Sequence, residues 1–177
     1  AGWDFAPADL ERPDFAANGY AHGVPMGGDL AKAPAGKSPV FLVYALRDTE
    51  GPNLDRIQIV KGWLGKDGKS QERIYDVAVS GGRKIGPDGR CKTPVGSTVD
   101  VAHATYTNTI GAPVLSAYWK DPEFEAKQEA FYYVRVIQIP SPRWTAYDQV
   151  RYGIKMPDYV PMTVTDRAYT SPVWYTP

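Results

Sequence analysis

The sequence has no excess of either charge, because 20 Lys and Arg residues balance 20 Asp and Glu residues. Nucleic-acid-binding proteins normally carry a basic excess that neutralises phosphates. No basic amphipathic segment suits a membrane surface, and no apolar run is long enough to cross a bilayer. The sequence therefore predicts neither a nucleic-acid partner nor a membrane span.

Cysteine and histidine are scarce. Cys91 is the only cysteine, which excludes a disulfide bond within the chain. It stands between Arg90 and Lys92, which favour the thiolate, but no general base lies near it in the sequence. His22 and His103 are far apart and belong to no zinc-binding pattern. We therefore predict no catalytic residue and no metal ligand in this chain.

Two short stretches match known motifs in part. Residues 31–38 read AKAPAGKS, which loosely matches the P-loop pattern, but Pro39 and a strand pattern follow where a P-loop requires a helix. Residues 121–125 read DPEFE and alternate carboxylates as calcium loops do, yet Ala126 stands where an EF-hand needs glycine. We interpret the first as an irregular approach to a strand and the second as a solvated acidic turn.

Strand patterns dominate the rest of the chain. Residues 39–48 form a continuous apolar run of strand length. Residues 55–64 and 71–80 alternate in character on either side of an Asp-Gly turn at 66–69, which predicts a β-hairpin. The aromatic and β-branched stretch 130–140 has the strongest strand signal.

Further strands are expected over 98–108, over 114–121 and in the last residues of the chain. Short strands without long helices between them are typical of an antiparallel sandwich. We therefore predict a mainly β protein in which residues 39–177 form an Ig-like antiparallel β-sandwich. Residues 1–38 are rich in Gly and Pro, and we interpret them as an irregular strap or as the end of an upstream domain.

One polar and aromatic stretch follows the strongest strand. Residues 142–153 place Arg143, Trp144, Tyr147 and Asp148 close together. Aromatic rings with Arg and Asp can form a surface for a small molecule or a glycan, by stacking and by paired hydrogen bonds. The alternative is a packed corner with an internal Arg–Asp pair, which is the commoner arrangement. These four residues are our candidate binding residues in this stretch.

Several blocks of the sequence resemble the carboxy-terminal part of a large family of secreted bacterial proteins of unknown function. The blocks are GYAHGVPMGGDL, NLDRIQIVKGWL, YDVAVSGGR, TNTIGAP, DPEFEAKQEAFYYVRVIQIPSPRWTAYD and RAYTSPVWYTP. The amino-terminal part of that family is similar to the PHP (polymerase and histidinol phosphatase) class of metal-dependent hydrolases. The resemblance implies a periplasmic or extracellular parent protein that hydrolyses phosphate or related esters. It also implies that the divalent metal and its ligands lie upstream, with none in this chain.

Three functions follow as hypotheses. The first is an accessory β domain, inactive alone, which completes the site of the upstream domain; Asp29, on the Gly-rich loop, would then point into that site. The second is a carbohydrate- or peptide-binding module that uses the aromatic residues near Trp144. The third is a purely structural domain. An exposed aromatic cluster around Trp144 would favour the second hypothesis.

Overall fold

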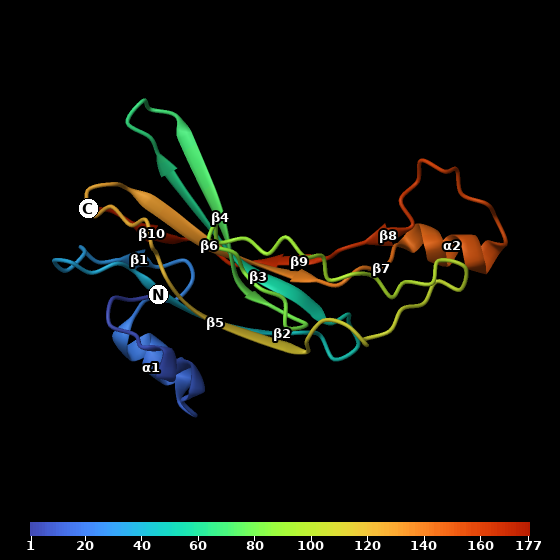
Figure 1. Cartoon of the computed structure of the whole chain (residues 1–177), viewed down its shortest axis with the longest axis horizontal. Coiled ribbons are helices and arrows are strands. Elements are labelled where there is room, and N and C mark those ends of the chain that lie inside the picture. The colour runs from blue at the N-terminus through green and yellow to red at the C-terminus, as the bar shows by residue number, and fades with distance from the viewer.

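The computed structural model describes residues 1–177 and is mainly β (Figure 1). Its three helical elements are short: a 3₁₀ helix at Pro7–Glu11, α1 at Phe15–His22 and α2 at Trp144–Tyr152. None of them has the length and apolar content that a membrane crossing requires. The fold therefore depends on its strands, as the sequence predicts.

The main sheet has six strands. Five follow the order β1-β10-β6-β3-β4, and β9 also pairs with β6. Their bounds are β1 (Asp29–Leu30), β3 (Leu54–Leu64), β4 (Ser70–Val79), β6 (Ala130–Gln138), β9 (Arg167–Tyr169) and β10 (Val173–Tyr175). The predicted hairpin is confirmed as β3 and β4, and the strongest strand signal as β6. β1 runs parallel to β10 while the other pairs are antiparallel, so the sheet is mixed.

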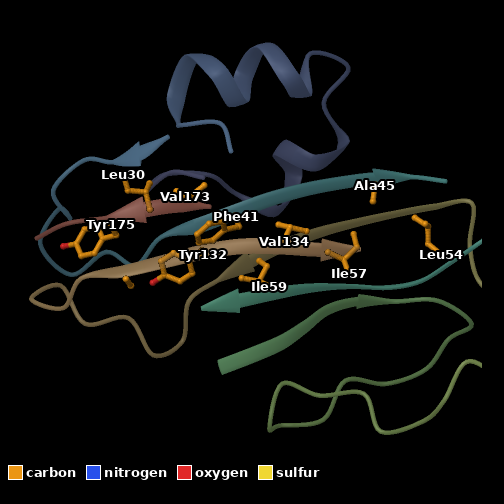
Figure 2. Packing of buried hydrophobic residues seen from close by; sticks show 11 residues of the cluster. Leu30, Phe41, Ala45, Leu54, Ile57, Ile59, Tyr132, Val134, Val173 and Tyr175 are labelled. Carbon is orange, nitrogen blue, oxygen red and sulfur yellow. The ribbon is translucent and has the colours of Figure 1, made fainter. Parts of the chain in front are cut away.

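The remaining strands form two small antiparallel pairs. β2 (Val40–Leu46) pairs with β5 (Val114–Lys120), and β7 (Ser141–Pro142) pairs with β8 (Thr163–Val164). The β2–β5 ribbon lies against one face of the main sheet (Figure 2). The prediction of a mainly β fold is confirmed. The antiparallel Ig-like sandwich is not clearly formed, because the second layer is only a two-stranded ribbon and the main sheet is mixed.

The core lies between the main sheet and this ribbon. Alternation along β3 turns Ile57 and Ile59 inward, and both side chains are completely buried. The Phe41 and Tyr132 rings meet there with their centroids 4.8 Å apart (Figure 2). One face of the sheet is therefore closed by the ribbon. A binding site has to lie on the other face of the sheet or at one of the two ends of the molecule.

Residues 1–38 contain short helices and β1 within otherwise irregular backbone. Gly2 forms an antiparallel bridge with Val40 at the start of β2. Phe5 and Leu30 are buried, and Leu30 belongs to the main hydrophobic cluster. The segment therefore packs against the same core as the sheet.

The prediction of a strand over residues 98–108 is wrong. Only an isolated bridge between Asp100 and Thr105 forms there, and the backbone between them turns. The Asp100 side chain accepts hydrogen bonds from the backbone N–H groups of Ala102 and His103, which favours a turn over a ladder. The hydrogen bonds of Asp100 to the backbone therefore stabilise a turn here, although the alternating residues around it favour a strand.

Candidate ligand-binding site

The predicted binding stretch folds into helix α2. Arg143 has extended backbone just before the first turn, and Gly153 ends the helix in the left-handed region at φ 62°. Thr145 and Ala146 face inward, and the Thr145 hydroxyl donates a hydrogen bond to the Pro161 carbonyl at 2.6 Å. This bond ties α2 to the segment that leads to β8, so the opposite side of the helix faces solvent.

The aromatic side chains of α2 are exposed: Trp144 by 60%, Tyr147 by 49% and Tyr152 by 64%. The Arg143 guanidinium lies 5.2 Å from the Trp144 ring centroid, a cation–π contact. Asp148 forms no salt bridge with Arg143 or any other residue. The internal ion pair that the packed-corner interpretation requires therefore does not form, and an exposed aromatic cluster is present instead.

Strand β1, which begins at Asp29, lies at the other end of the molecule from α2 (Figure 1). The Cα partner of Asp29 across the sheet is Trp174 of β10. The Trp174 N–H donates to the Gly28 carbonyl at 3.0 Å, which fixes this edge of the sheet. The structure therefore brings Arg143, Trp144, Tyr147 and Asp148 together on one helix and places Asp29 elsewhere.

Asp29 lies beside a group of aromatic rings on the face of the main sheet that the ribbon leaves open. We call this group the aromatic face; it consists of Phe131, Tyr133, Tyr169 and Trp174. Successive ring centroids lie 5.4 Å apart from Trp174 to Phe131, 6.5 Å from Phe131 to Tyr133 and 6.2 Å from Tyr133 to Tyr169. The rings therefore form one continuous aromatic surface across β10, β6 and β9.

Gly62 of β3 leaves room on this surface for the Phe131 ring. It is the cross-strand partner of Phe131, and a β-carbon added to Gly62 would lie 2.2 Å from Phe131 Cζ. The Phe131 ring therefore lies directly over the β3 backbone, in a space that only glycine leaves free. The rings of Phe131 and Tyr133 are nearly parallel, with an interplanar angle of 10°.

Charged residues border the aromatic face. Cross-strand partners point to the same side of a sheet, so Asp29 lies next to Trp174, and Glu72 lies next to Gly62. Both acidic residues are exposed, and neither carboxylate has a hydrogen bond or an ion pair within the protein. Arg135, the partner of Tyr169, donates a hydrogen bond to Gln58 Oε1 at 2.7 Å.

A buried charge network supports the core beneath this face. The Lys61 ammonium donates to Asp121 Oδ2 at 2.7 Å and to the Glu123 carbonyl at 2.7 Å. The Tyr132 hydroxyl donates to the same Asp121 oxygen at 2.7 Å. Burial, and then the charge of Asp121, raise the pKa of Tyr132 well above its usual value. These groups satisfy one another, and the prediction of a solvated turn at 121–125 is wrong for Asp121, whose side chain is completely buried.

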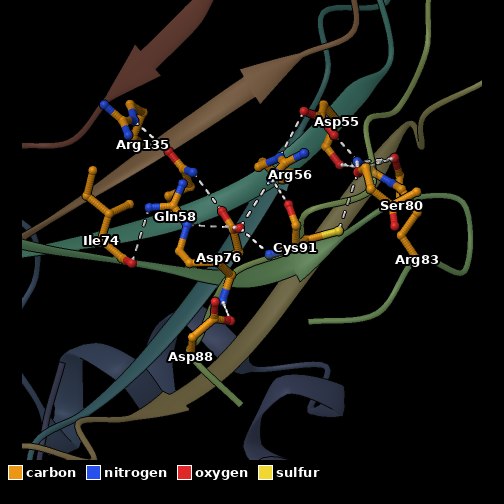
Figure 3. Close-up of polar contacts among 12 residues, drawn as sticks. Asp55, Arg56, Gln58, Ile74, Asp76, Ser80, Arg83, Asp88, Cys91 and Arg135 are labelled. Atoms are coloured by element: carbon orange, nitrogen blue, oxygen red, sulfur yellow. Dashed lines mark hydrogen bonds and ion pairs between the residues drawn. The ribbon is translucent and has the colours of Figure 1, made fainter. Parts of the chain in front are cut away.

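A second network holds the loop after β4 (Figure 3). The side chain of Asp76 is fully buried and accepts hydrogen bonds from Gln58 Nε2 at 2.6 Å and from the Cys91 N–H at 2.7 Å. Arg56 donates to it at 3.2 Å and also pairs with Asp55 at 2.9 Å. The Cys91 side chain is buried in this network, so the flanking basic residues do not make it an accessible nucleophile.

The chain brings no group of three or more His, Cys, Asp or Glu side chains together. His22 contacts the Asn18 carbonyl within its own helix, while the ring of His103 contacts Asp100 at 2.7 Å. Every buried side-chain nitrogen and oxygen has a hydrogen-bond partner. The polar interior is therefore structural, and the groups still able to meet a ligand lie on the surface.

Three hollows are larger than a single side chain. One, of about 590 Å³, lies beside α2 and is lined by residues such as Gln149, Met156 and Met162. A second, of about 410 Å³, is lined by six residues that include Lys61, Trp63 and Glu123. The third, of about 320 Å³, lies between α1 and β2, and 15 of its 18 lining residues are hydrophobic. Few side chains in this apolar groove could orient a ligand. The aromatic face combines rings with charged groups and is the better-equipped surface.

The fold and the open aromatic face define a mainly β module with a candidate ligand-binding surface. The chain belongs to the family described as "Protein of unknown function (DUF3604)", which matches residues 1–177. No curated protein and no solved structure matches it. The match confirms the resemblance to a family of unknown function. Nothing in the comparisons links the chain to PHP-type hydrolases.

Sequence reasoning missed the aromatic face, although one signal for it was present. In a strand, residues two apart share a side, so Phe131 and Tyr133 of β6 had to lie on one face. The polar residue expected on the outer side of a half-exposed strand was absent at both positions. The contributions of Tyr169 and Trp174 required the pairing of β9 and β10 with β6, which no local pattern reveals.

Proposed function

We propose that this chain is the accessory, ligand-binding β domain of a larger exported protein whose catalytic part is a PHP-like metal-dependent hydrolase outside this sequence. In this proposal the chain is inactive alone and works in the periplasm or outside the cell. The resemblance of the sequence blocks motivates the link to a hydrolase and the compartment. The structure contributes the ligand-binding part of the proposal.

One observation carries the binding role. The charged side chains in the interior all have partners within the protein, while large aromatic side chains are exposed at the surface. Lys61 and Asp121 pair with one another, and Asp76 is enclosed by its own partners. Trp144 and Trp174 are exposed by 60% and 47%, on two separate surfaces. Exposed aromatic groups next to polar ones are typical of interaction sites, and a fold-stabilising role does not require them.

Asp29 suits this role in a way that the sequence hypothesis did not describe. It is exposed at the sheet edge, beside Trp174, and its carboxylate has no partner within the chain. A carboxylate in such a place can accept hydrogen bonds from a ligand held against the indole ring. The upstream domain of the same polypeptide is the partner that would receive this ligand.

The test compares this chain with the complete product of its gene. Both proteins are purified and analysed for bound metal, and both are screened for hydrolysis of phosphate and sulfate esters. The proposal expects the complete product to hold metal and to turn over an ester, and this chain to do neither. Hydrolysis by this chain alone, or a gene product without a further domain, would overturn it.

A further inference from the structure

We propose that the aromatic face of the main sheet is a binding site for a neutral glycan chain. The inference rests on the proposed function and gives the ligand-binding domain a ligand class. It uses Phe131, Tyr133, Tyr169 and Trp174, none of which belongs to the aromatic cluster on α2. The argument depends on the shape of the surface, on its charge and on its unpaired carboxylates.

The shape suits sugar rings. A pyranose presents a face of C–H groups, which lies well against an aromatic ring, and a rim of hydroxyl groups. The Phe131 and Tyr133 rings are nearly parallel at 10°, and their centroids are 6.5 Å apart along β6. The Trp174 ring lies 5.4 Å from Phe131 and is tilted by 49° to it, and the Tyr169 ring lies 6.2 Å from Tyr133 with a tilt of 44°. Successive sugars of one chain can therefore each meet an aromatic group.

The charge of the surface excludes a strongly charged partner. Asp29 and Glu72 are acidic, while Arg135 and Arg167 are basic members of the adjoining strands. A phosphate-rich partner such as nucleic acid or an anionic membrane would require a clear basic excess. The mixed border favours a neutral ligand with many hydroxyl groups.

The unpaired carboxylates favour a glycan over an apolar protein surface as the occupant of the aromatic face. Asp29 and Glu72 lie in the same cross-strand row as Trp174, Phe131 and Gly62. An apolar partner seated on the rings would remove these carboxylates from water without giving them hydrogen bonds, which is costly. Sugar hydroxyl groups lie at the rim of each ring and can donate to carboxylates while the C–H face covers the aromatic floor.

The experiment is native affinity electrophoresis of this chain in gels that contain one soluble polysaccharide each. The probes are xyloglucan, mixed-linkage β-glucan, galactomannan and dextran as neutral glycans, with alginate as the anionic comparison. Trp174→Ala is the test variant, and Tyr159→Ala is its control because Tyr159 is an exposed aromatic residue that belongs to neither aromatic group. Circular dichroism checks that each variant is folded, and size-exclusion chromatography checks its oligomeric state.

We expect at least one neutral polysaccharide to retard the chain. Loss of one stacking ring in Trp174→Ala should weaken this binding by about tenfold, while Tyr159→Ala binds as the unaltered chain does. Asp29→Asn combined with Glu72→Gln tests the carboxylates at the border and should weaken binding in the same direction.

Three results would overturn the inference: no retardation by any neutral glycan, equal binding by Trp174→Ala, or an oligomer of the chain that only Trp174→Ala dissociates. The last would make the face an interface between copies. Ester hydrolysis by the complete gene product is a separate measurement, so failure of glycan binding and failure of the hydrolase proposal are distinguishable.

Discussion

Replacing Lys61 by methionine removes the cation from the buried charge network while keeping a long apolar side chain in its place. The Lys61 and Asp121 side chains are exposed by only 3% and 0%. After the change, Asp121 keeps hydrogen bonds from the Tyr132 hydroxyl at 2.7 Å and from the Glu123 N–H at 2.8 Å. It loses the ammonium group that compensates its charge, and the Glu123 carbonyl loses its donor.

The expected cost is large because the remaining carboxylate cannot reach water. Removing one member of a buried ion pair destabilises a protein by about 3–5 kcal/mol. With a urea dependence of about 2 kcal/mol per molar, the midpoint of urea unfolding should fall by roughly 2 M. Total stabilities of single domains are about 5–15 kcal/mol, so the Lys61→Met variant should be folded but clearly weakened.

The matched control is Lys69→Met in the turn of the same hairpin. Lys69 is exposed and lies 3.7 Å from Asp67, a surface ion pair worth less than about 0.5 kcal/mol. Adding Asp121→Asn to Lys61→Met removes the uncompensated charge and should recover part of the loss. If Lys61→Met and Lys69→Met shift the urea midpoint equally, the buried network does not support the fold as we argue.

Three further changes probe the same structure. Asp76→Ala removes the acceptor of hydrogen bonds from Gln58, Arg56 and the Cys91 N–H. It should lower the free energy of unfolding by about 3 kcal/mol, measured by thermal unfolding. Gly62→Ala brings a β-carbon to 2.2 Å from Phe131 Cζ and should displace this surface ring at a cost of about 1 kcal/mol, seen as loss of its ring-current shifts. Burial is the main cause that raises the pKa of both Tyr75 and Tyr132. The unfolded chain therefore loses these protons first, and stability should fall as the pH rises above about 10. Tyr132→Phe should flatten that decline in urea unfolding.

The elements that sequence reasoning predicted correctly are those whose pattern is local. The β3–β4 hairpin follows from alternation on both sides of an Asp-Gly turn, and β6 follows from its aromatic and β-branched residues. Helix α2 was missed because its aromatic and β-branched residues are weak helix formers. The flanking Pro142 and Gly153 were signals for its two ends.

The candidate site was harder to predict because pairing across the sheet creates it. Trp174 meets Phe131 only because β10 pairs with β6, and Asp29 joins them only because β1 adds in parallel to β10. The mixed sheet and the partial second layer likewise depend on which distant segments pair. Periodicity within one strand gives the side on which a residue lies, but not its neighbours on that side.

The central claim is that the aromatic face, and not the cluster on α2, receives a neutral glycan. The most direct measurement is an NMR titration of this chain with an oligosaccharide from the retarding polysaccharide, following the indole N–H signals of its five tryptophans. The account predicts that the Trp174 signal shifts in proportion to saturation while the Trp144 signal stays. A shift of Trp144 alone, or no shift of either, would contradict it.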